Sequence, residues 1–172
     1  LRLESKEAEK TPQNNTKPLV EKIELCAPVS GTVKALSDVP DKTFAEKVLG
    51  DGAAIIPEEG KVYAPADGTV ANIMDSKHGI MFVTDSGAEV LIHIGLDTVN
   101  LKGKYFKSYV SDGDKVKKGT LLVEFDLEAI KGEGYNLITP MVVTNISDYI
   151  KAVCMEKENT AINAGDKFLT VV

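Results

Sequence analysis

The chain has 172 residues, of which 43% are hydrophobic and 27% charged, a composition that fits one folded domain with a sizeable core and excludes a disordered chain. Its formal net charge of −6 argues against a nucleic-acid-binding surface, and no apolar run is long enough for a transmembrane helix. Cys26 and Cys154 lack metal-ligand or redox spacing and no secretory signal is visible, so we expect a cytoplasmic protein.

Residues 1–22 are polar and have no apolar face, so they are expected to form a linker or disordered tail that precedes one domain at 23–172. From Ile23 onward, short apolar runs alternate with Gly, Asp, Pro and Ser, which is typical of an all-β sandwich or barrel. Two short helical segments are expected within 41–52 and 126–132, because each begins with an Asp cap and ends near Gly. The expected strands are Glu24–Cys26, Gly31–Leu36, Ala54–Pro57, Lys61–Tyr63, Gly68–Ile73, Ile80–Thr84, Glu89–Ile94, Lys107–Val110, Leu121–Phe125, Met141–Thr144, Ala152–Cys154 and Phe168–Val172.

A faint internal repeat runs through these strands. The segment APVSGTV at 27–33 returns as APADGTV at 64–70, and SDGDKVKKGTLLVEFD is echoed by NAGDKFLTVV. Two copies are too few to stack as a solenoid. We therefore expect two similar sheet halves packed together.

The two histidines of the chain, His78 and His93, flank a predicted β-hairpin. A symmetric turn between Asp85 and Ser86 would place residue i opposite residue 171 − i, and therefore His78 opposite His93 on one face. A three-residue turn would shift this register by one position.

Two neighbouring imidazoles disfavour each other's charged form, which leaves a neutral, nucleophilic ring beside a second ring that can donate a hydrogen bond. Gly79 and Gly95 stand beside these rings in the sequence, and Ser76 and Asp97 are near enough to orient or polarise them. A single strand histidine is more often structural, whereas this pairing favours a functional site. Zinc enzymes use three protein ligands, and the chain offers no third one here, so we expect neither a metal nor a cofactor.

Several motifs resemble one bacterial family. They are APVSGTV, VPDKTFAEKVLGDGAAI, YAPADGTV, SKHGIMF, GAEVLIHIGLDTVNLKG and TPMVVTNI, and the resemblance that they carry runs from about Ile23 to the C-terminus. Together they resemble the glucose-type IIA domain of the phosphoenolpyruvate:sugar phosphotransferase system. The resemblance implies an antiparallel β-sandwich of Greek-key or jelly-roll type with a duplicated hybrid motif.

The resemblance also implies a function. The family accepts a phosphoryl group from the carrier protein HPr and passes it to a cysteine of the IIB domain for sugar uptake. The acceptor falls on His93, and His78 falls on the histidine that contacts the transferring phosphate. Ser76 stands where the family usually has Thr, and we expect its hydroxyl to keep the hydrogen bond to the His78 ring. The resemblance places partner-docking contacts at Asp97, Asp41, Phe44, Leu49, Met74, Leu91 and Val99.

Other functions stay open at this point. An IIA-like regulatory domain of a sugar transporter would be phosphorylated on the same histidine. A biotinyl or lipoyl carrier would use a lysine such as Lys115 at a hairpin turn, and a lysostaphin-type zinc peptidase would need a further His-x-His pair. The polar tail favours a C-terminal IIA domain of a fused permease, which would meet the membrane only through its attached domains.

Overall fold

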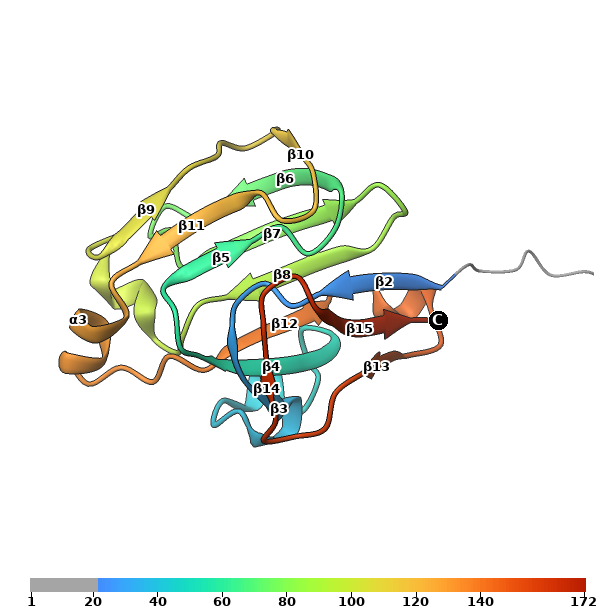
Figure 1. The fold of residues 1–172 in the computed structure, drawn as a ribbon, viewed down its shortest axis with the longest axis horizontal. Helices are drawn as coiled ribbons and strands as arrows, with labels where there is room; N and C mark the ends of the chain where they lie inside the picture. The colour runs from blue at the N-terminus through green and yellow to red at the C-terminus, as the bar shows by residue number, and fades with distance from the viewer. Residues whose placement is uncertain (1–21) are drawn as a thin grey trace, which may run out of the picture.

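The computed structural model describes residues 22–172, so the predicted linker lies almost entirely outside the described residues. The described chain is built mainly of short antiparallel strands, with a few helical turns between them (Figure 1). The strands are β2 (Ile23–Cys26), β3 (Gly31–Ala35), β4 (Asp51–Pro57), β5 (Lys61–Tyr63), β6 (Gly68–Ile73), β7 (Gly79–Thr84), β8 (Glu89–His93), β9 (Phe106–Ser108), β10 (Lys115–Val116), β11 (Leu121–Phe125), β12 (Thr139–Val143), β13 (Ala152–Cys154), β14 (Ala161–Ile162) and β15 (Lys167–Val171). The helices are α2 (Lys42–Ala45) and α3 (Leu127–Gly132), with 3₁₀ turns η1 (Leu36–Asp38), η2 (Thr98–Leu101) and η3 (Ile146–Asp148).

The predicted all-β sandwich is confirmed. An eight-stranded sheet has the order β10-β6-β7-β8-β12-β4-β3-β14, and two three-stranded sheets, β5-β11-β9 and β13-β15-β2, pack against one of its faces (Figure 1). Each predicted strand is present within a few residues of its expected ends. Strands β10 and β14 were not predicted, because a strand of two residues is too short to show a period-2 pattern.

The internal repeat corresponds to two structural halves of matching strand order. One half is continuous and runs from β5 to β11, whereas the other is discontinuous and consists of β2–β4 and β12–β15. In the large sheet, β10-β6-β7-β8 of the continuous half mirrors β14-β3-β4-β12 of the discontinuous half. The two similar halves that the repeat predicted join edge to edge through β8 and β12 within one large sheet.

Backbone hydrogen bonds repeat at corresponding positions of the two halves. The Cys26 amide donates to the Pro65 carbonyl at 2.8 Å, and the Tyr63 amide donates to the Pro28 carbonyl at 2.8 Å. Each position differs from its counterpart by the 37 residues (64 − 27) of the sequence repeat. The repeat therefore describes an approximate two-fold axis through the centre of the molecule.

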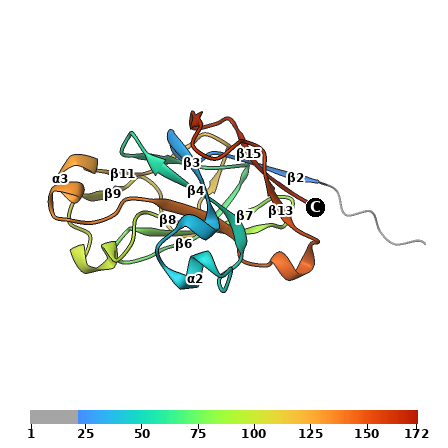
Figure 2. The same ribbon diagram turned by 90° about the horizontal axis from the view of Figure 1, so that it is seen from below.

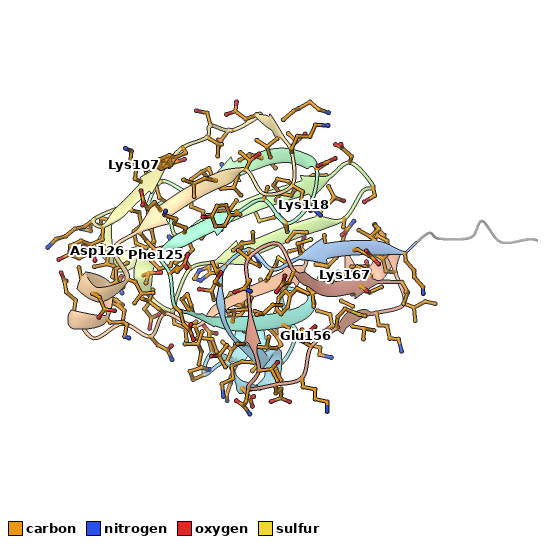
Figure 3. The ribbon with its side chains drawn as sticks, viewed as in Figure 1. Lys107, Lys118, Phe125, Asp126, Glu156 and Lys167 are labelled. Atoms are coloured by element: carbon orange, nitrogen blue, oxygen red, sulfur yellow. The ribbon has the colours of Figure 1, made fainter. Side chains whose placement is uncertain are left out.

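The main core lies between the large sheet and the two small sheets. Alternate residues of β7 and β8, such as Ile80, Phe82, Val90 and Ile92, point into it and are fully buried. Figure 3 shows Phe125 on β11 and Lys167 on β15, at the ends of matching strands in the two small sheets.

The two halves differ in the connection that follows their second strand. Residues 74–78 link β6 to β7 by a tight turn, whereas residues 36–50 link β3 to β4 through η1 and α2. This longer segment covers the outer face of the large sheet, on the side of the molecule opposite β2 and β15 (Figure 2). Its buried residues form a second apolar cluster with that face, which contains Leu36, Val39, Phe44, Ala54, Leu91, Leu96, Ile138 and Val142.

Within residues 22–172, no helix is both long and apolar enough to cross a bilayer.

Candidate functional site

The hairpin that carries the histidines has a different register from the predicted one. His93 pairs with Gly79 and Ile92 with Ile80, so residue i faces residue 172 − i. The turn contains three residues, and Gly87 at its end has φ of 103°. This left-handed residue supplies the extra position that shifts the register, as a bulged turn requires.

The two imidazole rings nevertheless meet. Their centroids lie 4.8 Å apart and their planes make an angle of 84°, an edge-to-face arrangement. His78 precedes β7, so the alternation of that strand does not fix the direction of its side chain. Its carbonyl accepts a 2.7 Å hydrogen bond from the Ile94 amide, which ties it to the end of β8. The predicted contact between the rings is thus present, although its geometric basis was wrong.

Gly79 leaves the position opposite His93 without a side chain. A Cβ at residue 79 would lie 2.4 Å from the sulfur of Met74, so Met74 already occupies that space. The glycine therefore lets a flexible thioether pack on the outer face of the hairpin.

His93 is held by a specific anchor. Its Nδ1 lies 2.7 Å from the Gly95 carbonyl oxygen, which can only accept, so Nδ1 carries the proton. Gly95 has φ of 75°, a conformation that glycine adopts without strain. Gly95 was expected to leave space beside the ring, whereas in the structure its carbonyl oxygen binds Nδ1 of His93. With Nδ1 engaged, Nε2 keeps its lone pair and is the nucleophilic atom of the ring.

Both histidines are held in the neutral form at pH 7. Burial is the main cause that lowers the pKa of His78, with a further contribution from His93, and together they bring it to about 4. Burial also lowers the pKa of His93. The hydrogen bond to Gly95 and the charges of Asp41 and Asp97 act in the opposite direction on His93. These two carboxylates therefore favour positive charge on the ring of His93.

The expected hydrogen bond from Ser76 to His78 is absent. His78 is 4% exposed, and its Nδ1 is buried without any hydrogen-bond partner. Ser76 lies in the tight turn closed by a 2.7 Å hydrogen bond from the Lys77 amide to the Met74 carbonyl. The turn fixes the backbone around Ser76, but the Ser76 hydroxyl makes no hydrogen bond to Nδ1 of His78.

Asp41 and Asp97 each begin a helical turn beside His93. Asp41 caps α2, where its carboxylate accepts a 3.0 Å hydrogen bond from the Thr43 amide. Asp97 precedes η2 with φ of 60° and makes no capping hydrogen bond, so its carboxylate is not committed to the backbone there. Lys47 and Lys77 also have positive φ, so left-handed residues occur in each of the loops that border the rings.

The predicted apolar docking residues fall into two groups. Leu49 and Val99 are 40% and 49% exposed, and Met74 is half-buried. Phe44 and Leu91 are buried, at 3% and 6% exposure, because η1 and α2 fold over the sheet and enclose them. The expectation that these two form a docking surface is therefore wrong in this structure.

One exposed apolar residue at this surface was missed. Val48 is 69% exposed and adjoins Leu49 in the loop between α2 and β4. The sequence shows only that two apolar residues directly precede Gly50, and their exposure follows from the helix ending at Ala45, which the sequence did not indicate.

Other features of the chain lie apart from the histidines. A hollow of about 700 Å³ contains none of the predicted site residues and is bordered by Glu24, Asp67, Asp85, Lys118 and Lys167. Figure 3 labels the last two of these residues. Lys115, the residue that a carrier domain would modify, belongs instead to β10, and its amine lies 3.9 Å from the Asp85 carboxylate.

Comparisons with known proteins agree on one family. A family model described as the phosphoenolpyruvate-dependent sugar phosphotransferase system, EIIA 1, matches residues 23–149. A β-glucoside-specific EIIBCA component of the phosphotransferase system from Bacillus subtilis is 53% identical over 123 residues, which are 72% of this chain and 20% of that protein. A glucose-specific EIIA component from Halalkalibacterium halodurans is 46% identical over 146 residues, which are 85% of this chain and 83% of that protein. This chain thus spans a fifth of the first relative and matches most of the second.

Among solved structures, glucose permease IIA from Mycoplasma capricolum is similar with a TM-score of 0.78 and 32% sequence identity. The similarity covers 87% of this chain and 96% of that one. It therefore extends over both structural halves.

Proposed function

Because the chain belongs to the EIIA 1 family of the phosphoenolpyruvate-dependent sugar phosphotransferase system, we propose that it is a phosphocarrier that works through His93. In this proposal Nε2 of His93 accepts a phosphoryl group from phosphorylated HPr. A cysteine thiolate of a IIB domain then takes the group from His93 for sugar uptake and phosphorylation. The domain would act on the cytoplasmic side of a permease, whether fused to it or free.

The observation that carries the proposal is the fixed tautomer of His93. The 2.7 Å contact between Nδ1 and the Gly95 carbonyl leaves the Nε2 lone pair free to attack phosphorus. As the new N–P bond forms, the bond between phosphorus and the donor nitrogen of HPr breaks, and the freed electron pair stays on that donor. Phosphoryl transfer of this kind depends on positioning and charge stabilisation more than on proton chemistry.

The surrounding groups fit the charges of that step. Nδ1 of His93 keeps its proton, so the ring becomes positive as Nε2 gains phosphorus. Asp41 and Asp97 favour this positive charge, in agreement with the direction in which they shift the pKa of the ring. Neutral His78, whose ring centroid is 4.8 Å from that of His93, can donate a ring N–H to a phosphoryl oxygen without keeping the group.

The same carboxylates suit a partner that supplies positive charge. We expect Asp41 and Asp97 to contact arginines of HPr and of the IIB domain, while Val48, Leu49, Met74 and Val99 make the apolar contacts. A small apolar patch with an acidic rim favours fast, short-lived encounters, which a carrier with two successive partners requires.

Intact-mass spectrometry tests the proposal. The domain, its His93→Gln variant and its His78→Gln variant are incubated with phosphoenolpyruvate, the first enzyme of the system and HPr. We expect an acid-labile phosphate on the wild type and on His78→Gln, and none on His93→Gln. Onward transfer to a IIB domain should be slow from His78→Gln. Absence of phosphate on the wild type would overturn the proposal, and phosphate without onward transfer would favour a regulatory domain.

A further inference from the structure

The apolar residues near His93 were expected to contact partner proteins, but one of them, Phe44, is almost fully buried. Phe44 is 3% exposed and belongs to the apolar cluster on the outer face of the large sheet. Its ring centroid lies 5.2 Å from that of His93, with an angle of 55° between the planes. It therefore contacts the reacting residue from inside the protein.

The imidazole of His93 is consequently held from several directions. His78 approaches at 4.8 Å, Phe44 at 5.2 Å, and the Gly95 carbonyl binds Nδ1. The Gly95 hydrogen bond fixes which nitrogen is protonated, but one hydrogen bond leaves the ring free to swing about that contact. Packing against a buried aromatic ring removes this freedom, because a buried ring cannot give way without opening a cavity.

Phe44 is itself held firmly. Its amide donates a 3.0 Å hydrogen bond to the Asp41 carbonyl, and its side chain shares the outer apolar cluster with Leu91 and Val142. The comparison of the two halves shows how this contact arises. Of the two matched connections, 74–78 and 36–50, only the second contains a helix, and Phe44 of that helix contacts a histidine of the other half.

We propose that Phe44 is a positioning residue for phosphoryl transfer, which acts by fixing the imidazole of His93 with Nε2 directed outward. The proposal rests on the proposed function of His93 and assigns Phe44 a task other than partner binding. It distinguishes a buried support beneath the site from the exposed docking residues Val48, Leu49 and Val99.

The test compares Phe44→Leu with a matched control, Phe168→Leu. Phe168 is fully buried in β15 within the main core, so both variants lose an aromatic ring from an apolar cluster. Leucine keeps the apolar character of residue 44 and avoids the large cavity that alanine would create. Urea unfolding first establishes that both variants are folded under assay conditions.

The first readout is nitrogen NMR of the unphosphorylated domain, which needs no partner protein and so does not depend on the proposed function. In Phe44→Leu we expect a mixture of His93 tautomers and a His93 pKa that moves upward toward its ordinary value, because water gains access to the ring. In Phe168→Leu both properties should match the wild type. Unchanged His93 signals in Phe44→Leu would overturn the proposal.

The second readout is the rate of phosphoryl transfer from phosphorylated HPr. A positioning role predicts that kcat falls about tenfold in Phe44→Leu while KM stays near the wild-type value. Phe168→Leu should change neither. A raised KM with unchanged kcat would show that Phe44 is a docking residue after all and would overturn the proposal. If even the wild type accepts no phosphate, the proposed function fails, while NMR still tests the positioning of the ring.

Discussion

At the scale of single residues, the histidine pair combines two rings with unequal surroundings. His93 has an anchored Nδ1 and two flanking carboxylates, whereas His78 has a buried Nδ1 without a partner. An unpartnered buried nitrogen makes protonation of His78 unfavourable, since the charged ring would lack both water and an acceptor. The difference supports the proposal that His93 is the nucleophile and that His78 acts as a neutral hydrogen-bond donor.

The buried state of His78 predicts a pH-dependent stability. Its pKa is about 4 in the folded protein and 6.5 in the unfolded chain. Between these values the unfolded chain binds a proton that the folded protein does not, so stability falls as pH falls through this window. The shift corresponds to a loss of about 3 kcal/mol of unfolding free energy.

The His78→Gln variant should lack this contribution. Urea unfolding at pH 7 and at pH 4.5 would measure it as a smaller loss of stability in the variant than in the wild type. Parallel losses in the two proteins would contradict the assignment. Carboxylates that titrate in the same pH range contribute equally to the loss of stability in both proteins, so their contribution cancels in the comparison.

Ser76 provides a second prediction at this scale. Because its hydroxyl makes no hydrogen bond to Nδ1 of His78, Ser76→Ala should leave the pKa of His78 unchanged in an NMR titration. A shift of that pKa would show that the serine hydroxyl binds the ring in solution, as the family resemblance had suggested.

At the scale of elements, the segment that contains η1 and α2 builds the surroundings of His93 on the outer face of the large sheet. It encloses Phe44 against His93 and brings the capping carboxylate of Asp41 into range of the ring. The capping signal and the apolar residues of this segment were readable from the sequence. The length of the helix was not readable from the sequence. Helix α2 has only four residues, and the chain then turns at Lys47, which has φ of 60°.

Two variants at Asp41 should separate its structural role from its electrostatic one. Asparagine caps a helix about as well as aspartate, so Asp41→Asn should keep the stability of the domain and lower the pKa of His93 further. Asp41→Ala should lower that pKa in the same way and also cost about 1 kcal/mol of unfolding free energy. NMR titration and urea unfolding measure the two effects. Equal stability of the two variants would exclude a capping role.

At the scale of the whole molecule, the approximate two-fold symmetry accounts for most of the architecture. The repeated segments at 27–33 and 64–70 indicated two similar halves, and the turn residues predicted where most of the strands begin and end. The edge-to-edge junction of β8 and β12 could not be read from local pattern, because it joins segments far apart in the chain. The hairpin register was missed for a smaller reason, a single left-handed glycine at residue 87.

The symmetry also allows a comparison of matched glycines. Gly52 and Gly79 occupy matching positions near the start of the corresponding strands β4 and β7. A Cβ added at residue 52 would lie 2.0 Å from the Met141 carbonyl oxygen, whereas a Cβ added at residue 79 would lie 2.4 Å from the Met74 sulfur. A backbone atom cannot move aside as a thioether can, so Gly52→Ala should cost about 1–3 kcal/mol and Gly79→Ala less. Thermal or urea unfolding of both variants would reveal the difference, and a larger cost at residue 79 would contradict it.

The central claim is that Nε2 of His93 is the phosphoryl acceptor because the Gly95 carbonyl engages Nδ1. Nitrogen–phosphorus coupling in the NMR spectrum of the phosphorylated, nitrogen-labelled domain tests it most directly. We expect phosphorus coupled to Nε2 of His93, with Nδ1 of the same ring still protonated. Phosphorus on Nδ1 of His93, or on either nitrogen of His78, would contradict the account.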